Sequence, residues 1–199
     1  MKFSNKLFFV ILVLFSIQVL QAQHIDIDKK LLSFLAVEKT INILFTYDGL
    51  KFNEDNEPEE GYLEDITLGE KKRYYKSKDS IWPIKFTTTL NSKLKEYKNG
   101  PQFNIKDSTA NYTMRVNNSW MYFGYNVIAA KWPAKAKLDL TFYETSNPET
   151  IIYETTIDKA LGTNNEVYNL DKWSKFNRVA KAYEKGAYKL AQAFKRIVN

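Results

Sequence analysis

A short segment near the middle of the chain carries the aromatic side chains best suited to ligand binding. Trp120, Tyr122, Phe123 and Tyr125 lie close together in the sequence, and Trp132 follows soon after. Side chains alternate between the two faces of a strand, so these rings cannot all point into one core. The rings left outside could line a surface that binds a sugar or a peptide. Packing in the core and against a neighbouring loop is the alternative.

A second group of candidate binding residues lies on the polar side of the last helical segment. Residues 171–199 hold eight basic and two acidic side chains, and the candidates are Lys175, Arg178, Lys185 and Lys189. A basic face of this kind can contact an anionic lipid, lipopolysaccharide or an acidic protein. A solvated helix face is the alternative. We expect no nucleic-acid partner, because no recognised nucleic-acid-binding module is visible.

Carboxylates are the main candidates for catalysis. Asp139, Glu144 and Glu154 lie in or beside a predicted hairpin, where two facing carboxylates could do acid–base chemistry. Acidic residues on the solvent face of a strand explain them more simply. The sequence shows no nucleophile elbow, phosphate-binding loop or dinucleotide fingerprint. We therefore expect a protein that is not an enzyme and that carries no cofactor.

The sequence gives little support for a metal site. An acidic run at residues 54–60 suggests calcium, but Pro58 interrupts it and Gly61 follows it, whereas a calcium loop needs its glycine inside the turn. A solvated loop is the simpler interpretation. The single histidine, His24, could bind copper weakly at a free N-terminus, and a frayed terminus is the simpler interpretation there. The lack of cysteine excludes disulfides, thiolate zinc sites and a cysteine nucleophile.

The N-terminal residues predict export. Residues 1–22 combine two lysines, an apolar run over residues 7–20 and Ala22 at a plausible cleavage point, which together are typical of a secretory signal peptide. A membrane anchor is the alternative, but the run is shorter than the roughly 20 residues that span a bilayer. We expect a mature chain of residues 23–199 without a transmembrane span. We place it in the periplasm or at the outer membrane.

The remaining residues predict a single α+β domain with a substantial core, since 44% of the chain is hydrophobic. Alternation predicts strands and a 3.6-residue period predicts helices. We expect a two-layer sandwich in which two helices cover a mixed or antiparallel sheet of about four strands, in the order β-α-β-β-β-α. The predicted elements are a strand at 40–47, an irregular insertion at about 48–80, a helix at 82–97, an extended segment at 103–105, a strand at 112–127, a connection at 129–136, a hairpin at 138–157 with a loop longer than two residues, and a helix at 171–198.

The last of these helices has a single apolar stripe. Its members recur at steps of three and four residues: Trp173, Phe176, Ala180, Tyr183, Ala187, Leu190, Phe194 and Ile197. We expect the stripe to pack on the sheet of the same chain, because that sheet needs a cover. A coiled coil or a helix that binds a partner is the alternative.

This element order after an export signal resembles small envelope lipoprotein domains. Two kinds that it resembles are the lipopolysaccharide-assembly lipoprotein and the N-terminal domain of the curli-secretion lipoprotein. The residues that carry the likeness are 41–47, 84–98, 111–127, 138–157 and the closing helix. The segment at residues 111–148 is also similar to exported Bacteroidota envelope proteins. Such lipoproteins are anchored through a cysteine, whereas this chain has none. The resemblance implies an accessory or assembly role without enzymatic chemistry.

The leading functional hypothesis is therefore a non-enzymatic accessory protein of the periplasm or outer membrane. Its partner would be an envelope protein or an anionic envelope component, and its oligomeric state is left open. The alternative is a secreted glycan- or peptide-binding module that uses the aromatic surface around Trp120, Tyr122, Tyr125 and Trp132. A carboxylate-dependent hydrolase is the third hypothesis.

Overall fold

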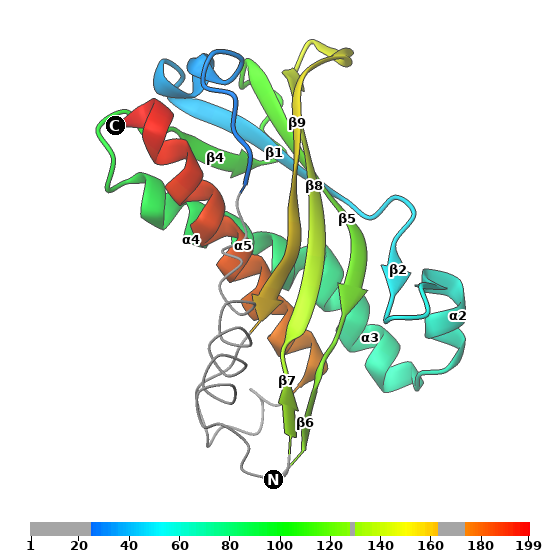
Figure 1. The fold of residues 1–199 in the computed structure, drawn as a ribbon. Helices are drawn as coiled ribbons and strands as arrows, with labels where there is room; N and C mark the ends of the chain where they lie inside the picture. Colours follow the sequence, from blue (N-terminus) through cyan, green and yellow to red (C-terminus); the bar gives the residue numbers. More distant parts are fainter. Residues whose placement is uncertain (1–24, 128–129, 163–173) are drawn as a thin grey trace, which may run out of the picture.

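The computed structural model describes residues 25–127, 130–162 and 174–199, which form an α+β fold (Figure 1). The predicted signal peptide and His24 lie outside these residues. The strands are β1 (Thr40–Thr46), β2 (Lys51–Phe52), β3 (Glu57–Pro58), β4 (Gln102–Ile105), β5 (Tyr112–Tyr122), β6 (Tyr125–Val127), β7 (Ala130–Trp132), β8 (Ala134–Glu144) and β9 (Asn147–Gly162). The helical elements are η1 (Ser33–Ala36), α2 (Glu59–Glu64), α3 (Leu68–Lys76), η2 (Ser77–Ile81), α4 (Trp82–Leu94) and α5 (Lys175–Val198).

β5 is the central strand of the main sheet. β8 pairs antiparallel along one of its edges, and β9 pairs antiparallel with β8. On the other edge, β1 and then β2 pair with β5 in parallel. β4 joins β1, and β3 joins β2. The predicted mixed sheet is therefore confirmed, although it contains seven strands in the described part of the chain rather than about four.

α4 and α5 lie side by side and cover one face of this sheet (Figure 1). Most of the predicted stripe of α5 is buried there: Phe176, Ala180, Tyr183, Ala187, Leu190 and Phe194. Ile197 is partly buried against the same core, and Trp173 lies outside the described residues. Burial of this stripe removes apolar area from water, which favours docking of α5. Packing of α5 on the sheet of its own chain is thus confirmed.

The prediction of a solvated loop at the acidic run, residues 54–60, is wrong in part. β2 and β3 form a small hairpin there, and α2 begins at Glu59. The rest of the predicted irregular insertion forms α3 and then runs through the π-helical segment η2 into α4. Thr67 and Glu70 start α3 with a reciprocal capping box. The sequence pattern did not predict these elements, because the segment is rich in charged residues and only a few widely spaced aromatic residues reach the core.

Those scattered aromatics hold the insertion against the rest of the fold. The Phe52 ring stacks on Tyr62, with ring centroids 4.4 Å apart, and on Phe123, at 5.5 Å. Tyr74 meets Trp82 edge to face at 5.9 Å. Stacked and edge-to-face pairs of this kind add stability beyond the area that they bury. The insertion therefore belongs to the domain core.

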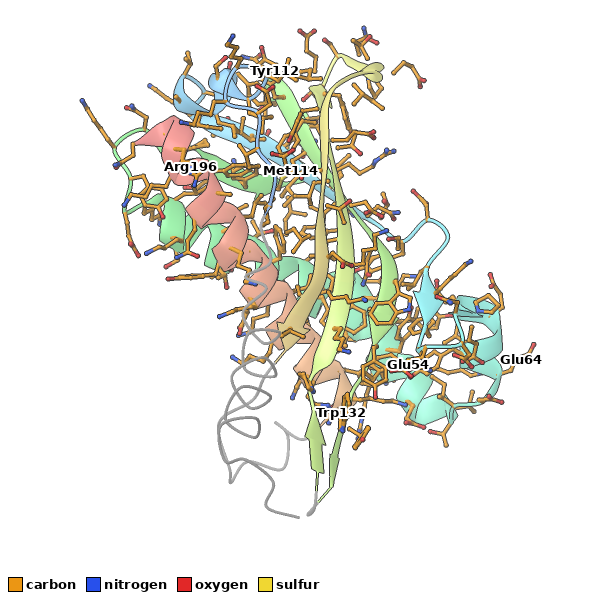
Figure 2. All side chains as sticks on the ribbon, viewed as in Figure 1. Glu54, Glu64, Tyr112, Met114, Trp132 and Arg196 are labelled. Carbon is orange, nitrogen blue, oxygen red and sulfur yellow. The ribbon has the colours of Figure 1, made fainter. Side chains whose placement is uncertain are left out.

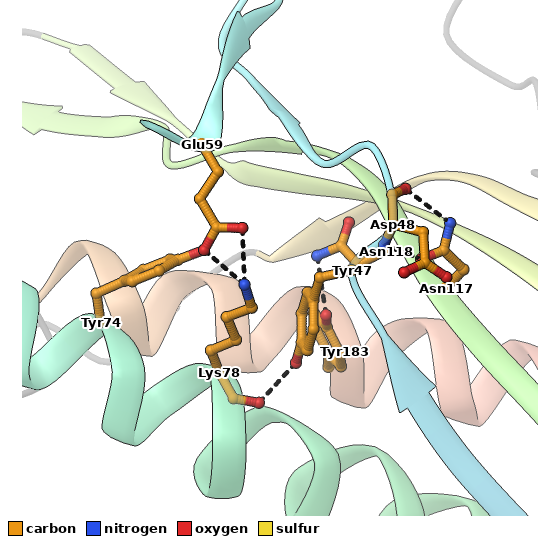
Figure 3. Close-up of polar contacts among 8 residues, drawn as sticks. All are labelled: Tyr47, Asp48, Glu59, Tyr74, Lys78, Asn117, Asn118 and Tyr183. Atoms are coloured by element: carbon orange, nitrogen blue, oxygen red, sulfur yellow. Dashed lines mark hydrogen bonds and ion pairs between the residues drawn. The ribbon is translucent and has the colours of Figure 1, made fainter. Parts of the chain in front are cut away.

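A partly buried ion pair lies where α2 meets η2 (Figure 3). The Lys78 ammonium contacts both carboxylate oxygens of Glu59, and the Tyr74 hydroxyl donates to the same carboxylate at 2.7 Å. The side chains of Lys78 and Glu59 are only 15% and 19% exposed. Burial and then the Glu59 carboxylate raise the pKa of the Tyr74 phenol, so that it stays protonated and donates. These contacts tie α2 to α3 and to η2, which runs directly into α4.

The second half of the chain differs from its prediction in three places. The predicted connection at residues 129–136 contains β7 and the start of β8, and β7 pairs with β6 as a separate hairpin. The β8–β9 hairpin has a turn of two residues, because Glu144 pairs with Asn147. β9 also continues to Gly162, beyond the predicted end at residue 157. Bulges in this region break the alternation of side chains that indicates a strand, so the sequence pattern predicts strands that are too short.

No helix within the described ranges is both long enough and apolar enough to cross a bilayer.

Candidate functional site: a groove over two bulges

Two β-bulges flank Lys137, which lies on β8. On one side, Asn118 pairs with Leu138 and Trp120 pairs with Lys137, so Ser119 is an extra residue in β5. On the other side, Asp158 and Lys159 of β9 both lie opposite Lys137. Lys159 has a φ of 46°, which is uncommon for a residue with a side chain. Bulges of this kind bend the sheet and re-aim side chains, and they are frequent beside functional sites.

The bulge in β5 changes which face its side chains occupy. Before it, Met114, Val116 and Asn118 are buried toward the helices. After it, Met121 takes the buried position, so Trp120 and Tyr122 point to the opposite face. A shift of one residue reverses every later side chain, because the period of a strand is two. We call this opposite face of β5, β8 and β9 the open face.

Asn118 and Tyr183 support this bulge from the helical side. Asn118 and the Tyr183 hydroxyl lie 2.8 Å apart (Figure 3). With the Asn118 amide oriented to pair all of its groups, its nitrogen donates to the carbonyls of Trp120 and Lys137, at 2.9 and 3.1 Å, and its oxygen accepts from Tyr183. The amide therefore hydrogen-bonds to backbone carbonyls at the point where the bulge interrupts the pairing of β5 with β8.

The open face is hollowed above the two bulges. The hollow, which we call the two-bulge groove, has a volume of about 610 Å³, within the usual range for ligand sites. It lies between the β2–β3 hairpin and β9, with β5 and β8 beneath it. Its lining residues are Gly49, Lys51, Glu54, Asn56, Ser119, Trp120, Lys135, Lys137, Asp158 and Lys159. The lining holds four lysines and two carboxylates, and a third carboxylate, that of Asp139, lies 4.0 Å from the Lys137 ammonium. The groove therefore keeps a positive balance suited to an anion.

The Trp120 ring is held in place at the groove. Its indole nitrogen donates to the carbonyl of Asn53 at 2.8 Å. Its ring stacks on Tyr122, with centroids 6.4 Å apart and planes at 14°. The Lys135 ammonium lies 5.5 Å from the Tyr122 centroid, close enough for a cation–π interaction. These contacts fix an aromatic surface next to the lysines before any ligand arrives.

Tyr125 and Trp132 lie on the β6–β7 hairpin, which extends the sheet beyond the groove (Figure 2). The two residues are a cross-strand pair with ring centroids 6.0 Å apart, and they are 42% and 48% exposed. Gly124 makes the bend before β6 with a φ of 62°. Arg178 donates to the carbonyls of Phe123 and Gly124, both at 2.9 Å. Arg178 thus positions the base of this hairpin.

The structure separates the other predicted basic residues from the groove. Lys175 pairs with Glu70 at 2.8 Å and lies 5.3 Å from the Tyr62 ring centroid. Burial opposes the charge of Lys175, but hydrogen bonds to Glu70 and Tyr62 prevail and raise its pKa. Lys185 lies beside Tyr188 further along α5. Burial, and then repulsion from Lys185, lower the pKa of Lys189.

The predicted binding residues therefore fall into three places. Trp120 lines the groove with Tyr122 stacked beside it, and Tyr125 and Trp132 lie on the adjoining hairpin, with Arg178 at its base. Lys175, Lys185 and Lys189 lie elsewhere on α5. The sequence interpretation missed the groove lysines Lys51, Lys135, Lys137 and Lys159. A signal for two of them was present, because residues 134–140 alternate strictly and place Lys135 and Lys137 on one face.

The candidate catalytic carboxylates are engaged in local contacts. Asp139 accepts from the Thr156 hydroxyl at 2.8 Å, and Glu154 accepts from the Thr141 hydroxyl at 3.3 Å. Glu144 lies at the end of β8, where the hairpin turns. In the acidic run, Glu59 pairs with Lys78. Across the residues that the structure describes, no three acidic or histidine side chains gather as a metal site.

The contact between Glu70 and Lys175 predicts a dependence of stability on pH. Hydrogen bonds from Lys175 and then Thr67 lower the pKa of the Glu70 carboxyl below its ordinary value of 4.5. A lowered pKa in the folded state stabilises the fold above pH 4.5, and this stabilisation is lost as the pH falls through the folded-state pKa. We expect Glu70→Gln to reduce the free energy of unfolding at neutral pH by under about 1 kcal/mol. The deficit should shrink in urea titrations at progressively lower pH, and a constant deficit would contradict this account.

Comparisons with known proteins show distant likenesses in structure. No protein-family model and no curated protein matches the chain. The PelC dodecamer from Paraburkholderia phytofirmans matches with a TM-score of 0.38 and 7% identity, over 79% of this chain and 87% of PelC. A neuraminyllactose-binding hemagglutinin homolog from Helicobacter pylori matches with a TM-score of 0.34 and 15% identity, over 81% and 83% of the two chains. The α+β assignment therefore rests on the sheet and helices of this chain itself.

Proposed function

We propose that this chain is an exported, non-enzymatic protein of the periplasm or outer membrane that binds an anionic envelope component in the two-bulge groove. The observation that carries the proposal is the groove itself. Lys51, Lys135, Lys137 and Lys159 line it together with Trp120, whose indole nitrogen is held by the carbonyl of Asn53. Ammonium groups pair with carboxylates, phosphates or sulfates, and the ring supplies an apolar surface.

Two further observations support this assignment. Lys137 of β8 lies opposite the bulge of β5 on one side and the bulge of β9 on the other. The two irregularities of the sheet therefore meet at a positively charged residue. The N-terminal sequence predicts export to the compartment where anionic envelope polymers and lipids are found. Acid–base catalysis is a weaker proposal, because Asp139 and Glu154 are each held by a threonine hydroxyl.

Retention on a sulfated polymer tests this proposal. We expect the purified chain to bind dextran sulfate beads at low salt, to bind uncharged dextran beads far less, and to be released at high salt. Lys137→Met should weaken this binding about tenfold, which is the expected loss of one charge-assisted contact. Lys135→Met serves as a second groove variant in case the bulge at Lys137 tolerates no change.

Lys95→Met is the matched control. It removes the same charge from the exposed end of α4, outside the groove. We expect it to bind like the wild type. Equal losses in Lys95→Met and in both groove variants would show that binding follows overall charge, and would overturn the groove as the site.

A further inference from the structure

The aromatic surface continues beyond the groove as a row of four rings. Trp120 stacks on Tyr122, and Tyr125 faces Trp132 across the β6–β7 hairpin. Tyr122 connects the two pairs through the backbone, because it ends β5 and Tyr125 begins β6 just beyond the bend at Gly124. We call Trp120, Tyr122, Tyr125 and Trp132 the aromatic row. Its outer members are the more exposed, so the row remains open toward the hairpin.

The form of this surface favours a chain-like ligand over a compact anion. Lys137 lies opposite Trp120, and Lys135 lies opposite Tyr122. The lysines thus flank the first two rings, and the exposed pair of Tyr125 and Trp132 follows beyond them. The ring centroids are 6.4 Å apart in the first pair and 6.0 Å apart in the second. Aromatic rings stack on the apolar C–H faces of sugars, and ammonium groups pair with their acidic substituents. An acidic sugar polymer presents both features at every repeat.

The position of the groove disfavours an extended peptide. A peptide strand usually binds by adding to a free sheet edge, where its backbone finds unpaired partners. The groove instead lies over β5 and β8, and both strands are already paired on both sides. Side chains alone must therefore recognise the ligand.

We infer that the two-bulge groove and the aromatic row together bind one acidic oligosaccharide, several sugar units long, with its charged groups at the lysines and its ring faces along the row. This inference rests on the proposed function and names the ligand class of the same site. The β6–β7 hairpin then serves as a second subsite, which Arg178 holds in position through the carbonyls of Phe123 and Gly124.

Calorimetric titration with oligosaccharides of graded length tests this inference. The probes are oligogalacturonides and heparin-derived oligosaccharides, each from disaccharides to octasaccharides, with neutral maltooligosaccharides of equal length. We expect affinity for the acidic series to rise with length and then to level off once the row is filled. The neutral series should bind at least about tenfold more weakly, because it forms no charge-assisted contacts.

Hairpin variants separate the two subsites. Trp132→Ala and Tyr125→Ala should weaken binding of the longest acidic probes about threefold to tenfold and leave the disaccharides unchanged. Lys137→Met should weaken both lengths. Tyr188→Ala is the matched control, because Tyr188 is similarly exposed, at 38%, but lies on α5. It should bind every probe like the wild type.

The outcomes distinguish this inference from the proposed function. If polyphosphate binds as tightly as the acidic oligosaccharides, the inference of an oligosaccharide ligand is wrong and the anion site remains. The same holds if binding of the acidic probes depends neither on their length nor on the hairpin residues. Binding to phosphatidylglycerol vesicles through Trp132, without binding of any sugar probe, would also overturn the inference. Failure of every acidic probe, together with no effect of Lys137→Met on bead retention, would overturn both.

Discussion

Gly162→Ala is expected to destabilise the fold by about 3 kcal/mol, because the added methyl group has no space. Gly162 lies at the end of β9, where α5 crosses the strand. A Cβ atom there would lie 2.0 Å from the carbonyl oxygen of Arg178 and 2.8 Å from the amide nitrogen of Ala182. Both are backbone atoms of a helix, so they cannot turn aside as a side chain would. Either α5 moves away from the sheet or β9 ends early.

Guanidinium unfolding monitored by circular dichroism measures this effect, and Gly186→Ala is the matched control. Gly186 also lies where α5 meets the sheet, but a Cβ atom there would be 3.4 Å from a methyl group of Leu138, an ordinary contact. Alanine also favours a helix over glycine by roughly 0.5–1 kcal/mol. We expect Gly186→Ala to be neutral or stabilising. Similar losses in the two variants would contradict the packing of α5 on β9.

Lys78→Met is expected to lower the free energy of unfolding by about 3 kcal/mol. The substitution removes the ammonium group from the Glu59 carboxylate and leaves that carboxylate in a site where its side chain is only 19% exposed. The Tyr74 hydroxyl would still donate to Glu59, but one neutral donor does not replace a cation. The same urea or guanidinium titration measures the loss. The aromatic contacts of the insertion should weaken with it, because α2 loses its tie to η2.

Two further variants test whether the loss of stability in Lys78→Met comes from the burial of the ion pair or from ion pairing alone. Lys93 forms a similar pair with Glu96, whose side chain is 57% exposed, so Lys93→Met should cost under about 1 kcal/mol. The double variant Glu59→Leu with Lys78→Met should recover part of the loss, because it removes both buried charges together. A loss in Lys78→Met no larger than in Lys93→Met would show that the burial of the pair does not matter.

The sequence predicted those elements whose hydrophobic period is uninterrupted. α5 is the clearest case, because Phe176, Tyr183 and Leu190 recur on one face and are buried there. β1 and α4 follow the same rule and begin where the pattern does. The insertion at residues 48–80 had no such period. Phe52, Tyr62 and Tyr74 are far apart in the sequence and form one aromatic cluster only after the chain folds back.

The chain alone thus determined its fold class and the presence of an aromatic segment and a cationic helix. Tertiary structure decided which side chains share a surface. A single bulge at Ser119 reverses the faces of β5, so Trp120 and Tyr122 meet Lys135 and Lys137 on the open face. A bulge is a property of the register between two strands, and register depends on contacts between distant residues. The composition of the groove was therefore set by strand pairing, which no local pattern in the sequence records.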